Sequence, residues 1–375
     1  MLDFFEDTVR VFSNPNVTDE MIADLITRLA RSGKTIECGT RAFDFASTGG
    51  PSSLSTVLVP LYLYALGENV INVAVPGRPA GVIDVLSQIP NYQLNGFDRP
   101  GAFHKHFCIH LEANENFAPL DKQLFDYRKK VNAVDNPNLA IASLLSKKIA
   151  GGASEIGLDV RVSPFGNFGK NWEQCINNAE KYNRIARLFG LNSKCFLSDA
   201  SSPYQPFIGR GEALIAISKI LNKECDGTLV EHNQYCIEIA RRMINTEKPL
   251  GTDGFREAFI DNLTEQGSGL KSFEAQVEQI KKQPYTLKLA ASNGYVEYDL
   301  QEIRRYLVFR QNSCSKLSKY PDPSGIILLH NQGDYVEKDE PILQIRNSVL
   351  DLEESFDFFN IKEDYKKENH KREVI

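Results

Sequence analysis

A hydroxyl-rich glycine turn is the first segment of this sequence that could do chemistry. Residues 44–56 (DFASTGGPSSLST) place it between a short apolar strand and an apolar helix. Gly49 and the glycine after it let the backbone come close to a ligand. N–H groups at the helix start, with the hydroxyls of Ser47, Thr48 and Ser55, could donate to phosphate oxygens. A plain turn capped by Ser or Thr has the same residues, and the segment holds no Lys, Arg or His, so both interpretations stay open.

A second group of donors lies in a stretch that we expect to be helical. Ser143 and Lys147 are four residues apart, so on a helix they project from one face, about one turn from each other. With Arg128 from the preceding helix, they would offer a hydroxyl, an ammonium and a guanidinium to the polar edge of a pyrimidine or to a small acid. A solvated helix face has the same spacing, and spacing alone does not separate the two interpretations.

Three histidines fall in the segment GAFHKHFCIHL of residues 101–111. His110 is near the carboxyl end of the expected strand, where a parallel sheet presents ligands, and it is a candidate proton donor. His104 and His106 share one face and superficially resemble metal ligands. No Cys or carboxylate spacing accompanies them, so we expect no metal and no cofactor.

Composition limits the class of protein and its partners. The chain has 375 residues, 42% of them hydrophobic, and a net charge of -6, which gives no electrostatic argument for nucleic acid or membrane as a partner. Its seven cysteines include no CxxC pair, as is typical of reduced thiols. The acidic N-terminal segment does not resemble a signal peptide, and no apolar run reaches membrane-spanning length. We expect a soluble cytoplasmic protein.

The elements that must position these residues alternate between strand and helix. Apolar strands and helices follow one another through residues 41–112 and again through 155–245, which predicts an α/β fold with a mostly parallel sheet. A helical insertion, broken at Asn136-Pro137, is expected to pack with the N-terminal helix. Short β-type runs with Gly turns follow residue 288. The predicted domains are a small helical domain (1–38 and 121–153), a larger α/β domain (39–120 and 154–284), a C-terminal α+β domain (285–350) and a charged tail (351–375), expected to be a solvated helix or frayed.

Several short motifs occur in an order that resembles one enzyme family. They cover roughly residues 40–345 and are Ser47-Thr48-Gly49-Gly50, Gly77-Arg78, Ala118-Pro119-Leu120-Asp121-Lys122, Arg128, Ala142-Ser143-Leu144-Leu145-Ser146-Lys147-Lys148, Asp159-Val160-Arg161-Val162, Ser198-Asp199, Gly294-Tyr295-Val296 and Gly333-Asp334-Tyr335-Val336. This order resembles the thymidine and pyrimidine-nucleoside phosphorylases, which are related in fold to anthranilate phosphoribosyltransferase.

The resemblance implies a reaction and roles for residues. In that family, phosphate attacks the anomeric carbon of a nucleoside as the base leaves. Arg128, Ser143 and Lys147 match the residues that recognise the base, and Lys147 would favour the departing anionic base. The resemblance places Ser47, Thr48, Gly49, Ser55 and Arg78 on the phosphate or acceptor side. It also implies a homodimer, with an altered interface because the matching segment begins after the family's first N-terminal helices.

The phosphate side departs from the family pattern. Where the family has Asp-Lys-His-Ser-Thr-Gly-Gly, this chain has Phe45 for the Lys and Ala46 for the His. Losing an ammonium removes a charge-assisted contact of about 1.5 to 3 kcal/mol. Phe45 could instead pack against the acceptor or the sugar. Arg161 and Arg210 could compensate as cations, or they could form surface or interdomain ion pairs. A phosphoribosyltransferase is less favoured, since the carboxylates that would hold Mg²⁺ are mostly absent.

These observations predict a pentosyltransferase of the pyrimidine-nucleoside phosphorylase type. Its partners would be a nucleoside and phosphate or an alternative acceptor. The alternatives are a nucleoside hydrolase or base-exchange transferase, and a catalytically silent nucleoside-binding protein.

Overall fold

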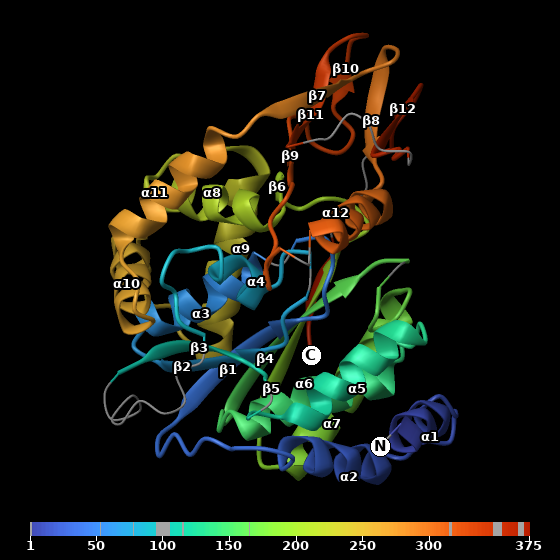
Figure 1. Cartoon of the computed structure of the whole chain (residues 1–375), viewed down its shortest axis with the longest axis vertical. Coiled ribbons are helices and arrows are strands. Elements are labelled where there is room, and N and C mark those ends of the chain that lie inside the picture. The colour runs from blue at the N-terminus through green and yellow to red at the C-terminus, as the bar shows by residue number, and fades with distance from the viewer. Residues whose placement is uncertain are drawn as a thin grey trace.

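The computed structural model describes residues 2–52, 54–77, 79–94, 106–114, 116–164, 166–314, 317–347, 355–366 and 371–375 (Figure 1). Its helices are α1 (Leu2–Phe12), α2 (Asp19–Ala30), α3 (Ser55–Ala65), α4 (Val82–Leu86), α5 (Pro119–Lys130), α6 (Pro137–Ala150), α7 (Trp172–Leu188), α8 (Arg210–Leu221), α9 (Gly227–Ile244), α10 (Thr252–Glu265), α11 (Leu270–Lys281) and α12 (Leu300–Cys314). Its strands are β1 (Ala42–Ser47), β2 (Asn69–Ala74), β3 (Cys108–Glu112), β4 (Glu155–Val162), β5 (Asn192–Asp199), β6 (Phe207–Ile208), β7 (Tyr285–Leu289), β8 (Gly294–Tyr298), β9 (Ile326–Leu328), β10 (Tyr335–Val336), β11 (Pro341–Arg346), β12 (Phe359–Lys362) and β13 (Arg372–Val374).

The main sheet has six strands in the order β13-β5-β4-β1-β2-β3. The five strands from β5 to β3 are parallel to their neighbours, and β13 joins the edge antiparallel to β5. This confirms the predicted α/β class with a mostly parallel sheet. Parallel strands are covered on both faces, so they read as continuous apolar runs, as in β4, where every residue after Glu155 is buried. Ser47 at the end of β1 pairs in register with Asp159 of β4.

Helices cover both faces of this sheet. Figure 1 shows α3, α9 and α10 on one side of it and α2, α5 and α6 on the other. Alternate residues of a strand point to opposite faces, so in β1 Phe43 and Phe45 join the core beneath α3, whereas Ala42 and Ala46 face the core of the α2 and α6 side. Helix α3 is apolar on all sides because the sheet, α9 and α10 enclose it.

The inserted helices α5 and α6 lie against the N-terminal helices. α2 contacts both of them, and the predicted break occurs where α6 starts at Pro137, with Asn136 as the N-cap that accepts a hydrogen bond from the Leu139 N–H. The inserted segment thus packs with the N-terminal helix, as its sequence predicts. The division of the chain into domains stays a prediction.

Beyond α11 the strands of the chain form two small sheets beside α12, one of which also includes β6 from the earlier part of the chain. Their strand orders are β10-β8-β12 and β6-β9-β11-β7. A buried ion pair joins this part to the rest, since the Arg346 guanidinium lies 2.7 Å from Glu212 of α8 and 2.9 Å from Asp322.

The prediction that residues 351–375 form a solvated helix or frayed tail is wrong for the described residues. β12 pairs with β8, and β13 pairs with β5 of the main sheet. Phe359 and Ile361 alternate with polar residues along β12 and pack on the core of the small sheets, a period of two that the surrounding charges obscure. No helix in the described part of the chain has both the length and the apolar character needed to cross a membrane.

Candidate active site

The glycine turn follows β1 at the carboxyl edge of the main sheet. Gly49 and Gly50 adopt φ angles of 101° and 129°, a region that favours glycine. The Thr48 N–H donates to the Asp159 carbonyl over 3.0 Å, and the Thr48 hydroxyl accepts from the Arg161 N–H over 3.0 Å. The backbone N–H and the side-chain hydroxyl of Thr48 therefore both attach the start of the turn to β4.

The side chain of Arg161, a residue of β4, stabilises the turn through hydrogen bonds to its backbone. Its guanidinium is 4% exposed and forms an ion pair with Asp159 over 3.1 Å. It also donates to the carbonyl oxygens of Gly49, over 3.3 Å, and of Ser52. Burial acts to lower the pKa of Arg161, but Tyr204 and Asp159 outweigh it, so that the pKa is raised. The guanidinium thus acts as a structural support of the turn, with its hydrogen bonds directed to the protein itself.

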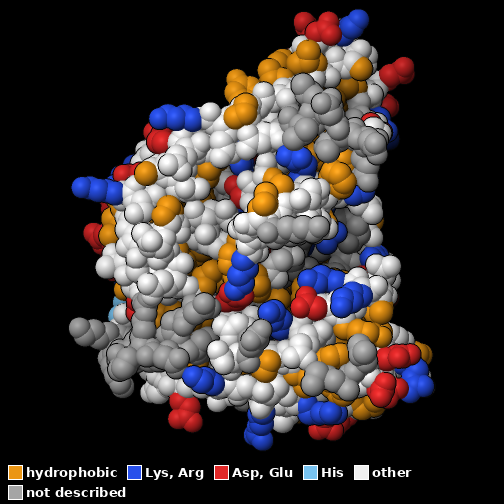
Figure 2. Space-filling model, viewed as in Figure 1, with side chains coloured by type: hydrophobic (Ala, Val, Ile, Leu, Met, Phe, Trp, Pro, Cys, Tyr) orange, Lys and Arg blue, Asp and Glu red, His pale blue; other side chains and the backbone are white. Residues whose placement is uncertain are grey.

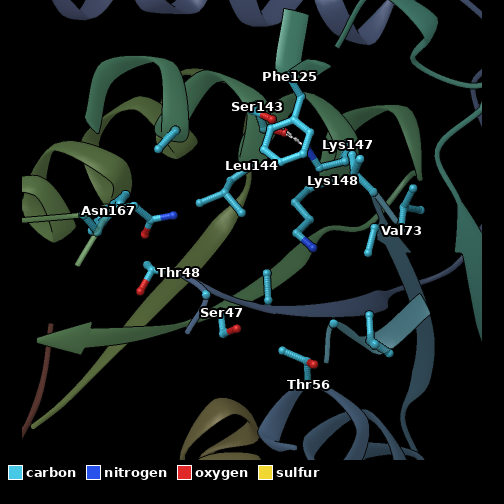
Figure 3. A pocket seen from close by; sticks show the side chains of 18 of the residues that line it. Ser47, Thr48, Thr56, Val73, Phe125, Ser143, Leu144, Lys147, Lys148 and Asn167 are labelled. Atoms are coloured by element: carbon cyan, nitrogen blue, oxygen red, sulfur yellow. Dashed lines mark hydrogen bonds between the residues drawn. The ribbon is translucent and has the colours of Figure 1, made fainter. Parts of the chain in front are cut away.

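A cavity of about 110 Å³ lies between the turn and helices α5 and α6 (Figure 3). Among the residues that line it, the sequence had singled out Ser47, Thr48, Gly49, Arg128, Ser143 and Lys147. The structure therefore brings the donor group of α5 and α6 to the same cavity as the glycine turn.

Lys147 and Ser143 form one hydrogen-bonded group on α6. The Lys147 ammonium, 6% exposed, lies 2.7 Å from Oδ2 of Asp121 and 2.9 Å from Oγ of Ser143, and it also donates to the Ser143 carbonyl. Burial lowers the pKa of Lys147, and Asp121 opposes this shift. The three ammonium protons thus have acceptors, whereas the Ser143 hydroxyl accepts one of them and keeps its own proton to donate.

Arg128 fixes the loop between α5 and α6. Its Nε, Nη1 and Nη2 atoms donate to the carbonyl oxygens of Ala133, Leu139 and Val134, over 3.1, 3.2 and 2.8 Å. The side chain is 2% exposed, and burial lowers the pKa of Arg128 to about 10. A guanidinium has five N–H groups, so the geometry leaves two of them for a ligand.

Sequence reasoning assigned no role to Lys148, which also lines this cavity. Its ammonium lies 2.7 Å from Oδ1 of Asp44 and points into the cavity near Ser47 (Figure 3). Burial raises the pKa of Asp44 to about 6, although Lys148 and backbone donors oppose the shift. Successive helical residues differ by about 100° in direction, so Lys148 faces the sheet while Lys147 faces α5. Asp44 and Lys148 are far apart in the sequence, so no local residue spacing could have predicted this ion pair.

Several predicted site residues are not at this cavity. Ser55 is fully buried behind the turn, where its hydroxyl donates to Asp159 over 2.7 Å and accepts from Arg161 over 3.0 Å, so its prediction as an acceptor-side residue is wrong for this structure. Arg78 lies outside the described residues. Arg210 is buried and pairs with Asp84 over 3.0 Å, and its Nε donates to the Pro79 carbonyl over 3.2 Å.

His110 does not reach the cavity either. It is fully buried, and its Nδ1 lies 3.0 Å from the Tyr92 hydroxyl and 3.3 Å from the Asn262 amide nitrogen. Burial lowers the pKa of His110 to about 3. Its neighbours Ile109 and Leu111 belong to the core on the α6 side, so His110 points to the opposite face, toward α10. The expectation that it serves as the proton donor is thus not supported by its position.

Phe45 occupies the core, although it borders the cavity. Its side chain is 1% exposed, and its ring lies 6.4 Å from the Phe196 ring, centroid to centroid. A Cβ added at Gly157 would come within 2.6 Å of the Phe45 ring, so the glycine makes room for it. Phe45 therefore packs in the core between the sheet and α3, in place of the expected contact with an acceptor or a sugar.

The chain resembles known proteins at low identity over most of its length. No protein-family model matches it. It is 28% identical over 279 residues to a thymidine phosphorylase of Sinorhizobium fredii. This match covers 72% of this chain and 62% of that relative, so the chain spans less than two thirds of the relative's length. It is 25% identical over 379 residues to a pyrimidine-nucleoside phosphorylase of Staphylococcus epidermidis, covering 94% of this chain and 84% of the relative.

Among solved structures, the chain is similar to an anthranilate phosphoribosyltransferase from Thermus thermophilus, with a TM-score of 0.46 and 15% sequence identity over 69% of this chain and 84% of the other. The curated relatives confirm the resemblance that the ordered motifs predicted, and the predicted enzyme class, glycosyltransferase, agrees with them. The chain is thus similar in sequence to the thymidine and pyrimidine-nucleoside phosphorylases, at 24–28% identity.

Proposed function

We propose that this protein is a pentosyltransferase that cleaves or forms the N-glycosidic bond of a pyrimidine-like nucleoside. The observation that carries the proposal is that Arg128, Ser143 and Lys147 line one cavity together with the glycine turn that starts at Thr48. Transfer of a pentosyl group needs both parts side by side, because the base must be held while the sugar is presented to an acceptor.

The base would be recognised by the donors that remain available. The Ser143 hydroxyl and two N–H groups of Arg128 are suited to the carbonyl oxygens of a pyrimidine. Lys147 orients the Ser143 hydroxyl, because its ammonium already donates to Oγ over 2.9 Å. Its positive charge would also stabilise the negative charge that the departing base acquires, in part offset by Asp121.

The acceptor side is altered in this proposal. Phe45 takes the place of the family's lysine and packs in the core, and the cations that line this cavity in the described residues, Arg128, Lys147 and Lys148, all have partners in the protein. Weak or absent binding of inorganic phosphate in the family's manner would follow. This observation favours, as a second candidate, hydrolysis or base exchange, and a silent nucleoside-binding protein is the third.

The test is to incubate the pure protein with uridine, thymidine or cytidine, with and without phosphate, and to measure the release of the free base. Phosphate-dependent release supports phosphorolysis, phosphate-independent release supports hydrolysis, and binding without turnover supports a silent module. Ser143→Ala should weaken nucleoside binding about 10-fold, as expected for a lost hydrogen bond in a closed site.

Ser146→Ala is the matched control, since Ser146 is fully buried on the same helix and does not line the cavity. Equal nucleoside affinity of the two variants would contradict the base-site assignment.

Compartment and assembly complete the proposal. All seven cysteines are free thiols, which supports the predicted cytoplasmic location. A homodimer with an altered interface is expected from the family, and sedimentation of the full chain would measure its oligomeric state.

A further inference from the structure

A second and larger cavity, of about 1010 Å³, opens beside the first. It is bordered by the glycine turn, the loop between α5 and α6, the loop after β4 and one face of α12. Figure 2 shows Lys and Arg side chains around the hollow between the C-terminal part of the molecule and the helices below it. Thr48 and Gly49 line both cavities, so a ligand held in the first could extend into the second.

Four cations line the larger cavity among the described residues, and three have carboxylate partners. Lys129 lies 2.7 Å from Asp126, Arg161 lies 3.1 Å from Asp159, and Lys170 lies 3.5 Å from Asp135. Asp135 is also the one carboxylate among the described lining residues. These three cations therefore bring little unbalanced charge to the cavity.

The fourth cation is Arg304 of α12. It belongs to a stripe of residues spaced by four, from Leu300 through Arg304 and Val308 to Asn312, that faces the cavity. In the described part of the chain, Arg304 has no ion pair and no hydrogen bond, whereas its neighbour Arg305 pairs with Glu302 over 2.7 Å. Its side chain is exposed and lines the cavity, and desolvation by the surrounding protein lowers its pKa.

The surroundings of Arg304 suit an oxyanion. Gln301 on the same helix and Asn132 across the cavity supply amide groups, and the turn at Gly49 and Gly50 supplies backbone close to the opening. A guanidinium in such a setting can bind two oxygens of a phosphate group at once. Arg304 takes part in none of the ion pairs of the described residues, so its charge is available to a ligand.

We propose that Arg304 binds a phosphate group of the substrate mixture, at a subsite that α12 brings to the mouth of the active site. This inference rests on the proposed function for the identity of the organic ligand. The phosphate group has two sources with the same chemistry: a phosphate ester on the sugar of the nucleoside-like substrate, or free inorganic phosphate as the acceptor. In either case α12 would supply a cation that the glycine turn lacks.

The experiment compares Arg304→Gln with Arg305→Gln, the adjacent arginine, which is on the same helix and outside the cavity. Calorimetry would measure binding of uridine, uridine 5′-monophosphate and inorganic phosphate to the wild-type protein and to both variants. We expect Arg304→Gln to weaken binding of the phosphate-bearing probe about 10- to 100-fold, the equivalent of one charge-assisted contact, while Arg305→Gln binds as the wild type does. The affinity of the wild-type protein for the phosphate-bearing probes should also fall when salt is added.

The three probes separate the outcomes. If the wild-type protein prefers uridine 5′-monophosphate to uridine and Arg304→Gln loses this preference, the ligand of Arg304 is the phosphate ester. If Arg304→Gln loses affinity for inorganic phosphate alone, the ligand of Arg304 is the inorganic phosphate that serves as acceptor. Unchanged binding of all probes by Arg304→Gln, or a wild-type protein that binds neither phosphate-bearing probe, would overturn the inference. Binding of inorganic phosphate that depends on Arg304, with no binding of either uridine compound, would support the subsite and reject the proposed nucleoside function.

Discussion

The Nζ atom of Lys148 lies 2.7 Å from Oδ1 of Asp44, and the two side chains are 1% and 0% exposed. This ion pair joins α6 to the first strand of the sheet, directly beneath the cavity. The other Asp44 oxygen accepts from the Val73 N–H over 3.3 Å, so the carboxylate is held from β2 as well. The pair therefore fixes the distance between the group of helices that carries the donors and the sheet that carries the turn.

The pair should make stability depend on pH. The pKa of Asp44 is raised by burial to about 6, above its unfolded value, so its contribution to stability is complete below about pH 4 and is lost as the pH rises through about 6. Lys148→Met removes the cation and raises the pKa of Asp44 further. We expect the variant to lose about 3 to 5 kcal/mol of unfolding free energy at pH 8 and clearly less at pH 5.

Urea unfolding at the two pH values measures this difference. The double variant Asp44→Asn with Lys148→Met is the control, because it holds no unpaired buried charge, and it should be more stable than Lys148→Met at pH 8. A loss in Lys148→Met of equal size at both pH values would show that Asp44 carries no charge to be left unpaired.

His110 should behave as a structural residue. Its pKa is lowered by burial to about 3, below the unfolded value, so its contribution to stability is complete above about pH 6.5 and is lost as the pH falls toward 3. The loss amounts to about 1.4 kcal/mol per pH unit in that range. We expect His110→Gln to lower the melting temperature at pH 7.5 and to flatten the loss of stability between pH 6.5 and 5.

The same variant tests the catalytic role that the sequence suggested. Base release by His110→Gln should stay within a few-fold of the wild type under conditions where both are folded. A drop of 100-fold or more, with unchanged secondary structure, would restore His110 as a proton donor.

Asp121 should set the pH range over which the base site works. Burial lowers the pKa of Lys147, and Asp121 limits this effect through its contact over 2.7 Å. In Asp121→Asn the pKa of Lys147 should fall further, so the ammonium would lose its proton, and nucleoside binding would decline, at a lower pH than in the wild type. Nucleoside affinity measured from pH 6 to 10 would show the shift.

Asp126→Asn is the control for this measurement, because Asp126 is a half-exposed residue of α5 that pairs with Lys129. It should leave the pH profile unchanged. Identical profiles for Asp121→Asn and the wild type would mean that the charge of Lys147 does not contribute to binding.

Arg161 should be needed for the shape of the glycine turn. A lysine in its place cannot reach the carbonyl oxygens of Gly49 and Ser52 and Asp159 together, since it has one nitrogen in place of a planar guanidinium. We expect Arg161→Lys to lose about 1 to 3 kcal/mol of unfolding free energy, because the ammonium keeps the charge beside Asp159 but leaves buried carbonyl oxygens without a donor. Denaturant unfolding would measure it, with Arg187→Lys on the exposed face of α7 as the control. A loss below 1 kcal/mol would contradict the role of Arg161 as the support of the turn.

The sequence predicted the order of strands and helices and several polar residues of the first cavity, because these depend on local periodicity and on ordered motifs. Arg128, Ser143 and Lys147 were found this way. The face toward which His110 points was not predictable, since the strands of this sheet are apolar on both faces and their alternation carries no mark of direction. The partners of Lys147 and Lys148 were also missed, because Asp121 and Asp44 come from distant segments that only the packing of α6 brings close.

The strand β13 has a consequence for the order of synthesis. β5 is made long before residues 372–374, yet among the described residues its outer edge is paired by that strand alone, through bonds such as the one from the Cys195 N–H to the Ile375 carbonyl over 2.8 Å. While the chain is being translated, the emerging sheet therefore keeps an open edge of the kind that recruits other strands. The protein should therefore be more prone to aggregate before residues 372–374 have emerged than after they have paired with β5.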